Sequence, residues 1–247
     1  MNNVKRINWI IPMCGDGKRT KELGNFKPLI IIKDKTIFDH FLEGLNHQIQ
    51  KDDLITLIIK RNVNEYKKKI QLLKQSCRKY TVCKNIEIKI IEHDTAGPCD
   101  TVRNIIDQLK DELIGLIINP DQKIDFEINR NIINADTIFL AIGFDNKKKS
   151  SYVLINKNSL IEEIREKENI SFYASTGVYI FGSNQLLKKC MNDFYKTKIA
   201  KLNGEHYISH LVNNAIKNKI TVRPLETFLK YDLGNIDSIK NFQRTLN

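Results

Sequence analysis

Five short and nearly continuous apolar runs constrain the fold of this chain more than any other feature of its sequence. Each is rich in Ile or Leu and has the length of a β-strand; they cover residues 7–13, 54–60, 86–92, 113–119 and 137–143. Strands that are apolar on both faces are typical of a parallel sheet covered on both sides. Helical patterns separate the runs at residues 38–48, 64–79, 101–110 and 125–134. The alternation predicts an α/β fold with a Rossmann-like, doubly wound sheet that is mixed but mostly parallel.

The pattern changes after residue 146, where strands follow one another before helices return. We expect strands at residues 152–156, 160–166, 173–181, 221–223 and 227–230, and helices at residues 184–194, 205–218 and 236–246. No Pro-, Gly- or Ser-rich linker and no internal repeat divides the 247 residues. The sequence therefore predicts a single domain, 1–247, whose two halves meet near residue 146.

The positive charge of the chain does not by itself indicate nucleic acid. The formal net charge is +11, but the lysines are scattered and no motif interleaves basic and aromatic residues as base-reading proteins do. Anionic small substrates account for the charge equally well. The apolar runs are too short to span a membrane, and the N-terminus does not lead into a signal-peptide core. We expect a cytoplasmic protein that binds neither nucleic acid nor membrane.

The cysteines and histidines do not predict a metal centre or a disulfide framework. The five cysteines are an odd number, widely spaced and without a C-x-x-C motif, so we expect buried, reduced thiols. His206 and His210 have helical i, i+4 spacing, but no third ligand stands near them in the sequence, which argues against zinc.

A glycine loop follows the first apolar run and suggests a polyphosphate site. The loop contains Gly15 and Gly17, and the cations Arg19 and Lys27 come after it. Glycines let backbone N–H groups approach phosphates, and cations offset the phosphate charge. A glycine turn followed by two solvated cations is the simpler alternative.

The two best-known phosphate loops do not fit this segment. A Walker A loop fails because Pro12 occupies its first glycine position and Arg19 replaces its Ser or Thr. A dinucleotide fingerprint fails because Thr20 stands where its third glycine is needed.

The pattern Gly15-x-Gly17-x-Arg19 with a later Lys27-Pro28-Leu29 resembles the signature of the nucleoside-diphosphate-sugar pyrophosphorylases, a nucleotidyltransferase family. In that family, G-x-G-[ST]-R and P-K-P-L hold the nucleoside triphosphate (NTP). The resemblance implies that Arg19 and Lys27 are catalytic, and that the nucleotide contacts Met13, Cys14, Gly15, Asp16 and Gly17.

Two further segments resemble the family's nucleotide and metal elements. Residues 93–101 resemble its base-recognition segment, which implies nucleotide contacts at Thr95 and Gly97; a helix N-terminal cap is the alternative reading. Residues 119–122 resemble its strand-end metal element, in the N-S-D-Q version of the capsule-type members, with Pro120 replacing a small residue. Asp121 would then contact nucleotide and metal, at the carboxyl end of a parallel strand, where ligands bind in open α/β sheets.

The acceptor elements resemble the family less closely. Glu166 and Lys167 resemble its E-K-P element without the proline, which implies contacts to the acceptor and its phosphate; a surface charge pair is the alternative. Residues 176–181 resemble its N-A-G-I-Y-x-F strand and residues 204–208 the N-E-x-Y segment of the capsule-type subgroup. These two segments imply acceptor contacts from Thr176, Gly177 and Glu205.

Residues 231–237 resemble the W-x-D-x-G-T-P-E-D element, in which Asp232 falls on the second metal carboxylate. A role in capping the last helix is the alternative for Asp232. The resemblance thus implies an NTP-binding half over residues 1–146 and an acceptor-binding half over residues 147–247.

Together these motifs imply Mg²⁺-dependent transfer of a nucleoside monophosphate from CTP, UTP or dTTP to a small phosphorylated acceptor, with release of pyrophosphate. The expected context is capsule or surface-polysaccharide biosynthesis. The acceptor is a sugar 1-phosphate or, with CTP, a phosphocholine- or phosphoglutamine-type compound. The sequence leaves open whether the protein forms a homo-oligomer.

Two other classes compete with this interpretation. A glycosyltransferase of similar fold would need a D-x-D metal motif, of which Asn119-Pro120-Asp121 supplies one aspartate. A non-catalytic, regulatory relative that binds nucleotides is the other class, against which four intact residues argue: Arg19, Lys27, Asp121 and Asp232.

Overall fold

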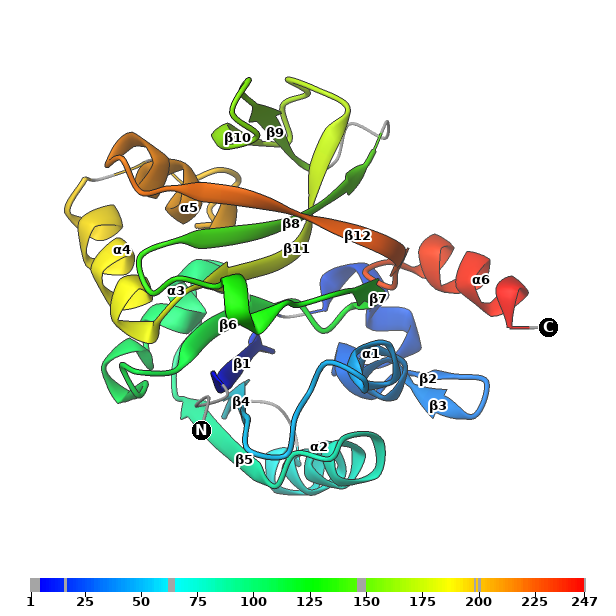
Figure 1. The fold of residues 1–247 in the computed structure, drawn as a ribbon. Helices are drawn as coiled ribbons and strands as arrows, with labels where there is room; N and C mark the ends of the chain where they lie inside the picture. Colours follow the sequence, from blue (N-terminus) through cyan, green and yellow to red (C-terminus); the bar gives the residue numbers. More distant parts are fainter. Residues whose placement is uncertain are drawn as a thin grey trace.

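A ten-stranded mixed sheet forms the centre of the protein (Figure 1). The computed structural model describes residues 5–15, 17–61, 65–145, 150–197, 199 and 201–246. The strands of the large sheet are β1 (Ile7–Pro12), β4 (Leu54–Lys60), β5 (Asn85–Ile91), β6 (Ile114–Ile118), β7 (Gln122–Phe126), β8 (Ile138–Phe144), β9 (Ser151–Ile155), β10 (Ile161–Glu166), β11 (Tyr173–Phe181) and β12 (Val222–Asp232). The short strands β2 (Ile31–Ile32) and β3 (Lys35–Thr36) form a separate hairpin.

The strand order is β5-β4-β1-β6-β11-β8-β12-β7, with β9 paired to β11 and β10 paired to β9. Strands β5, β4, β1 and β6 are mutually parallel, and β11 runs antiparallel to both β6 and β8. Strand β12 is parallel to β8, and β7 is antiparallel to β12. Most strands of this order therefore point the same way, which confirms the predicted α/β fold with a mixed, mostly parallel sheet.

Helices cover both faces of the sheet, as a doubly wound fold requires. They are α1 (Ile37–Leu45), α2 (Tyr66–Tyr80), α3 (Pro98–Arg103), α4 (Asn184–Lys196), α5 (Ile208–Lys217) and α6 (Ile236–Thr245). One core packs α3, α4 and α5 on the sheet, and a second packs α1 and α2 on the other face (Figure 1). Strand β1 shows why both faces must be covered: Ile10 enters the first core, whereas Trp9 and Ile11 enter the second.

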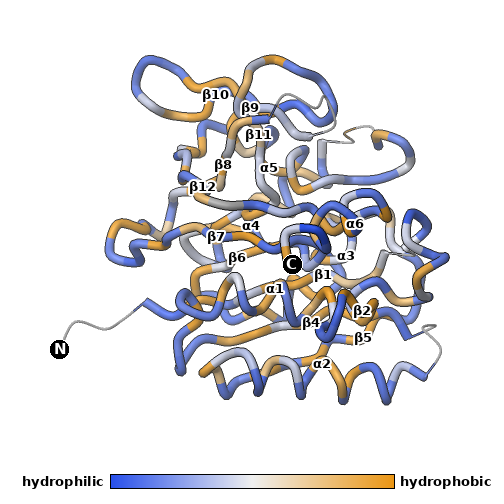
Figure 2. Tube along the Cα trace, turned by 90° about the vertical axis from the view of Figure 1, so that its right-hand side faces the viewer, coloured by the Kyte–Doolittle hydropathy of each residue, from blue (hydrophilic) through white to orange (hydrophobic). Residues whose placement is uncertain are grey.

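Local chemistry explains where several helices begin and how they pack. Thr36 and Asp39 form a capping box that starts α1. Leu73 and Cys77, four residues apart on α2, are buried, and hydrophobic and hydrophilic residues alternate along this helix (Figure 2). Helix α6 packs on the β2–β3 hairpin through a small third core that includes Ile239 and Phe242.

Four predicted elements differ from the structure in type or extent. Residues 125–134 do not form a helix: β7 ends at Phe126, and only a 3-10 turn, Arg130–Ile132, follows. Strand β7 alternates buried and half-buried residues, and it pairs with β12 about a hundred residues later. The helix expected at 101–110 is the shorter α3 with a 3-10 turn after it. The strands expected at 221–223 and 227–230 are one strand, β12.

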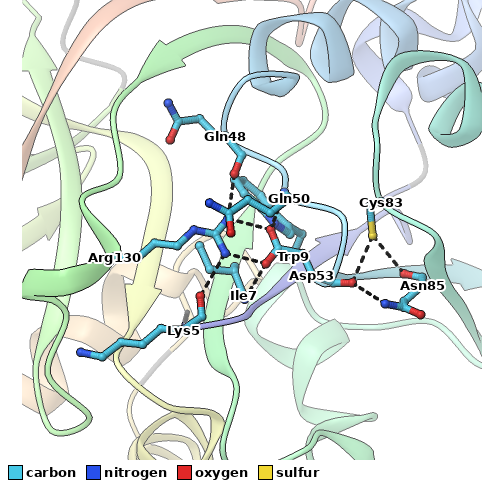
Figure 3. A network of polar contacts seen from close by, with 9 residues as sticks. All are labelled: Lys5, Ile7, Trp9, Gln48, Gln50, Asp53, Cys83, Asn85 and Arg130. Atoms are coloured by element: carbon cyan, nitrogen blue, oxygen red, sulfur yellow. Dashed lines mark hydrogen bonds and ion pairs between the residues drawn. The ribbon is translucent and has the colours of Figure 1, made fainter. Parts of the chain in front are cut away.

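A buried ion pair links the turn after β7 to β1 and to the residue before β4 (Figure 3). The Arg130 guanidinium binds both carboxylate oxygens of Asp53 at 2.6 and 2.7 Å. The same carboxylate accepts hydrogen bonds from the backbone N–H of Ile7 and from the indole of Trp9. Asp53 is fully buried and Arg130 nearly so, which makes this network a structural one far from the glycine loop.

The five cysteines are buried and unpaired, as expected. In the described residues, no helix is long and apolar enough to span a membrane.

Candidate active site

The glycine loop leaves β1 at the carboxyl end of the strand. Gly17 has a left-handed backbone, with φ +62°, and its carbonyl accepts hydrogen bonds from the backbone and hydroxyl of Thr20. This turn starts the 3-10 segment Lys18–Leu23, which carries Arg19 on its exposed side. Gly15 is exposed, with open space where a side chain would be. Asp16, which the sequence assigned to the nucleotide, lies outside the described residues.

The two residues before Gly15 belong to the core rather than to an open loop. The backbone N–H of Met13 donates to the carbonyl of Ile58 at 2.8 Å, which extends the pairing of β1 with β4. Burial raises the pKa of the Cys14 thiol to about 12, so the thiol stays neutral. Both side chains are buried, and the Met13 amide is used in the pairing with β4.

Lys27 and Asp121 meet across the site. Lys27 lies in the 3-10 turn Lys27–Leu29, and its Nζ is 3.0 Å from Oδ2 of Asp121, just beyond the end of β6. Desolvation acts to raise the pKa of Asp121, but the charges of Lys27, Arg19 and Lys230 outweigh it and the pKa is lowered. The carboxylate is therefore ionised at neutral pH.

Gly234 marks the point where the charged groups converge. A Cβ added to Gly234 would lie 2.9 Å from Oδ1 of Asp232, 3.1 Å from Oδ2 of Asp121 and 3.8 Å from Nη2 of Arg19. The backbone N–H of Leu233 donates to the carbonyl of Asp121 at 2.8 Å and holds this loop in place. Residues far apart in the sequence thus form one cradle of two carboxylates and two cations.

Asp232 also contributes to the start of α6. Its carboxylate accepts hydrogen bonds from the Gly234 backbone, the Asn235 amide and the Ser238 hydroxyl. The N-cap of α6 is Asn235, not Asp232. The capping alternative therefore applies only indirectly, because Asp232 orients the residue that caps the helix and keeps Oδ1 beside Gly234.

The cradle suits a divalent cation that is completed by substrate oxygens. Among the described residues there is no group of three or more Asp, Glu, His or Cys side chains that could hold a metal ion alone. Two carboxylate oxygens do face a space that the Cβ of an alanine at Gly234 would fill. Mg²⁺ commonly takes one or two carboxylates and completes its shell with water and phosphate oxygens, so this donor set fits it.

The segment expected to read the base packs against the acceptor half of the chain. Gly97, at the start of α3, has φ +94°, and a Cβ there would lie 2.8 Å from the carbonyl oxygen of His206. Two backbone hydrogen bonds join the segments, from His206 to Ala96 at 2.7 Å and from Cys99 to His206 at 3.1 Å. The Thr95 hydroxyl bonds to that of Thr101 at 2.7 Å.

Glu166 and Lys167 are both held in place by side chains of the α5 region. Glu166 accepts hydrogen bonds from the hydroxyls of Ser151 and Ser209. Lys167 has a left-handed backbone, with φ +59°, and its Nζ donates to the hydroxyl of Tyr207 at 2.8 Å. These contacts orient both side chains, and Lys167 itself is exposed.

The other three predicted acceptor residues, Gly177, Thr176 and Glu205, have different surroundings. Gly177, in a β-bulge of β11 with φ +86°, faces the amides of Asn119 and Gln122. Thr176 is buried, and its hydroxyl is bound to the carbonyl of Ala141 in β8. Glu205 is exposed beside Gly97, and its side chain interacts with Tyr207, the partner of Lys167. The structure thus places Glu205 on the Lys167 side of the site, whereas the Thr176 hydroxyl is bound within the sheet.

Several residues of the site escaped the sequence reasoning. Lys230 precedes Asp232 by two residues on β12, which places both on the same side of the strand, and its charge acts on Asp121. Tyr207 and Gly234 stood inside recognised motifs, but only the fold shows what they touch.

Comparison with known proteins finds a matching family model and similar solved structures. A family model described as "Nucleotidyl transferase" matches residues 10–247. The structure is similar to the nucleoside-diphosphate-sugar pyrophosphorylase from Vibrio cholerae RC9, with a TM-score of 0.78 and 19% identity over 96% of this chain and 99% of that one. It is also similar to the CTP:phosphocholine cytidylyltransferase from Streptococcus pneumoniae (TM-score 0.73, 16% identity, 98% and 100% covered). A third is the inositol-1-phosphate CTP transferase from T. maritima (TM-score 0.71, 14% identity, 96% and 93% covered).

At these identities the likeness to solved structures concerns the fold alone. Among curated proteins, none matches the sequence. The family model, in contrast, spans nearly the whole length, and the chain therefore belongs to the nucleotidyl transferase family.

Proposed function

We propose that this protein transfers a nucleoside monophosphate from CTP, UTP or dTTP to a small phosphorylated acceptor, using Mg²⁺ and releasing pyrophosphate, in capsule or surface-polysaccharide biosynthesis. The acceptor is a sugar 1-phosphate or, with CTP, a phosphocholine- or phosphoglutamine-type compound. The observation that carries the proposal is the convergence of Asp121, Asp232, Lys27 and Arg19 around Gly234.

The chemistry of the reaction fits such a cradle. A phosphate monoester has a second pKa of about 6, so the acceptor oxygen is charged at neutral pH and needs no general base. The difficulty lies in bringing two polyanions together, and catalysis of phosphoryl transfer is mostly positioning and charge stabilisation. Arg19, exposed next to the carboxylates, and Lys27, paired with Asp121, supply the positive charge.

Each residue then has a defined part. Backbone groups of Gly15 and Gly17 approach the triphosphate, and Arg19 and Lys27 neutralise the α-phosphate and the departing pyrophosphate. Asp121 and Asp232 would hold the metal ion, which when bound adds positive charge to the same phosphate oxygens. Asp121 stays ionised because three cations surround it. Lys167, fixed by Tyr207, holds the acceptor phosphate, and Glu166 holds the acceptor body.

The family and its solved relatives support this substrate pair. Members of the family typically use a divalent metal ion. The similar structures include a nucleoside-diphosphate-sugar pyrophosphorylase and a phosphocholine cytidylyltransferase, which correspond to the two acceptor classes proposed above.

The test is a pyrophosphate-release screen. Five NTPs are combined with glucose 1-phosphate, phosphocholine and phosphoglutamine, in Mg²⁺ and in EDTA. We expect release with at least one pair, dependent on Mg²⁺ and strongly reduced in Arg19→Ala. As a matched control, Ser183→Ala removes the N-cap of α4 and leaves the site intact.

Other results would point to other classes. Consumption of a nucleotide sugar without NTP would indicate a glycosyltransferase. Tight NTP binding without pyrophosphate release from any pair would indicate a non-catalytic relative.

A further inference from the structure

A buried amide with an unused hydrogen-bonding atom lies beside the metal cradle. Gln122, the first residue of β7, is only 3% exposed, and its Nε2 has no hydrogen-bond partner among the described residues. It faces the bulge at Gly177, where an added Cβ would lie 3.4 Å from Nε2 of Gln122 and 3.5 Å from Nδ2 of Asn119. Two side-chain amides therefore flank a spot on β11 that carries no side chain.

Burying the Gln122 amide without a hydrogen-bond partner costs free energy unless a ligand group binds to it. Buried polar atoms in folded proteins are nearly always paired, and an unpaired one loses its hydration without compensation. An apolar side chain of similar size would remove that loss. The retention of an amide at this place is explained if its partner is a group that arrives with a substrate.

The position of Gln122 identifies which substrate that is. Gln122 directly follows Asp121, and in the β7–β12 register it stands opposite Asp232. On the other side, the backbone N–H of Gly177 donates to the Ser175 hydroxyl at 3.1 Å. Tyr179, two residues after Gly177, lies near Glu166. Burial raises the pKa of the Tyr179 hydroxyl, and the nearby charge of Glu166 raises it further. The amide thus lies between the carboxylate cradle and the residue proposed to hold the acceptor.

We propose that Gln122 determines acceptor specificity by hydrogen-bonding a hydroxyl group of the acceptor, so that the substrate is a hydroxyl-bearing phosphate such as a sugar or polyol phosphate rather than phosphocholine. This inference rests on the function proposed above. A hydroxyl both donates and accepts hydrogen bonds, so it satisfies the amide in either orientation. A trimethylammonium group does neither and would leave the buried amide unpaired.

Sites that hydrogen-bond a substrate group discriminate strongly against analogues that lack this group, because the protein's buried polar atom is then left without a hydrogen-bond partner. One neutral hydrogen bond of this kind corresponds to about a 10- to 100-fold preference. Gln122→Met removes the amide but keeps a side chain of similar length and volume, so the core beside it stays filled.

The experiment compares kcat/KM for glucose 1-phosphate, glycerol 3-phosphate and phosphocholine in the wild type, Gln122→Met and a control. The control is Asn184→Leu, which removes another fully buried amide with an unpaired atom. Asn184 donates to the carbonyl of Lys110, before β6 begins, whereas Gln122 follows the opposite end of that strand. A general effect of losing a buried amide would appear in both variants.

We expect the wild type to favour a hydroxyl-bearing acceptor over phosphocholine. Gln122→Met should lower kcat/KM for that acceptor about 10- to 100-fold while leaving KM for the NTP and the rate with phosphocholine unchanged. Asn184→Leu should keep the wild-type preference. A wild type that prefers phosphocholine, or a Gln122→Met variant that affects all acceptors equally or none, would overturn the inference.

Binding measurements keep the inference separate from the proposed function. If no pair releases pyrophosphate, the proposed function fails, and calorimetric titration of glucose 1-phosphate and phosphocholine with CTP and Mg²⁺ present then decides on Gln122. Tighter binding of glucose 1-phosphate that is lost in Gln122→Met supports it. Equal affinities for the two compounds, or an unchanged preference in the variant, refute it.

Discussion

Replacing Gly234 by alanine should disable the carboxylate cradle without unfolding the protein. The added methyl carbon would stand 2.9 Å from Oδ1 of Asp232 and 3.1 Å from Oδ2 of Asp121, where ordinary contacts begin at 3.4 Å. The backbone at Gly234 does not adopt the left-handed conformation that disfavours alanine. The substitution therefore acts by moving the two carboxylates rather than by straining the chain.

The size of the effect follows from these distances. To reach ordinary contact, the carboxylates must retreat by about 0.5 and 0.3 Å. A displacement of about 1 Å in a catalytic constellation can cost about 100-fold in rate, and loss of one electrostatic contact costs about 100- to 1,000-fold. We expect kcat to fall about 10- to 100-fold, with a higher Mg²⁺ concentration at half-saturation. The free energy of unfolding should change by about 1 kcal/mol or less, because alanine also restricts the unfolded chain.

The assay is pyrophosphate release over a Mg²⁺ titration, with thermal unfolding measured on the same samples. Ser183→Ala serves as control, since loss of the α4 cap costs about 1 kcal/mol of stability and leaves the cradle untouched. A folded Gly234→Ala protein with wild-type kcat and wild-type Mg²⁺ dependence would refute the assignment of Asp121 and Asp232 to the metal.

Three further predictions concern single charges. Arg19→Ala should lower kcat about 100-fold with an unchanged melting temperature, because Arg19 is exposed; equal kcat in both proteins would remove it from the site. Desolvation opposes the ionisation of Asp121, but the charges of Lys27 and its neighbours outweigh it and lower the pKa below its ordinary value. The stabilising contribution of the ionised carboxylate is therefore present above that ordinary value and is lost as the pH falls through the lowered pKa. Asp121→Asn should thus flatten the acid limb of the stability–pH curve in urea unfolding, and an unaltered slope below pH 4 would contradict this. Arg130→Met strands the buried carboxylate of Asp53 and should cost about 3–5 kcal/mol in the same assay, whereas a loss under 1 kcal/mol would show that the pair of Figure 3 is dispensable.

Local sequence patterns predict the parallel strands of the sheet correctly. They do not predict strands whose pairing partners lie far along the chain. The runs behind β1, β4 and β6 are apolar on both faces, which is visible within a few residues. Strand β7 has a five-residue alternation, too short to outweigh the helical pattern that continues to residue 134 in the sequence, and its partner β12 lies far along the chain. Pro224 lies inside β12, between the two strands expected at residues 221–223 and 227–230. The strand tolerates it because this part of β12 pairs with β8 on one side only, and β7 joins after it.

The site was predictable as a set of charges but not as a geometry. Arg19, Lys27, Asp121 and Asp232 carried recognisable motifs, yet nothing in their spacing indicates that they surround Gly234. Likewise, Thr176 sits in a recognisable strand motif, and only the bulge in β11 shows that its hydroxyl turns toward β8.

Gly97 shows how a motif residue can be required for a reason other than ligand binding. The sequence suggests that its glycine lets the backbone approach the nucleobase. In the structure, the space where a Cβ would lie is filled by the backbone of His206, which also bonds to Ala96 and Cys99. The next residue, Tyr207, holds Lys167, so one loop connects the base segment with the proposed phosphate-binding lysine. Loss of activity in Gly97→Ala would therefore not by itself demonstrate nucleotide contact. A change in KM for the NTP alone would indicate a direct role, whereas parallel changes for NTP and acceptor would indicate displacement of this loop.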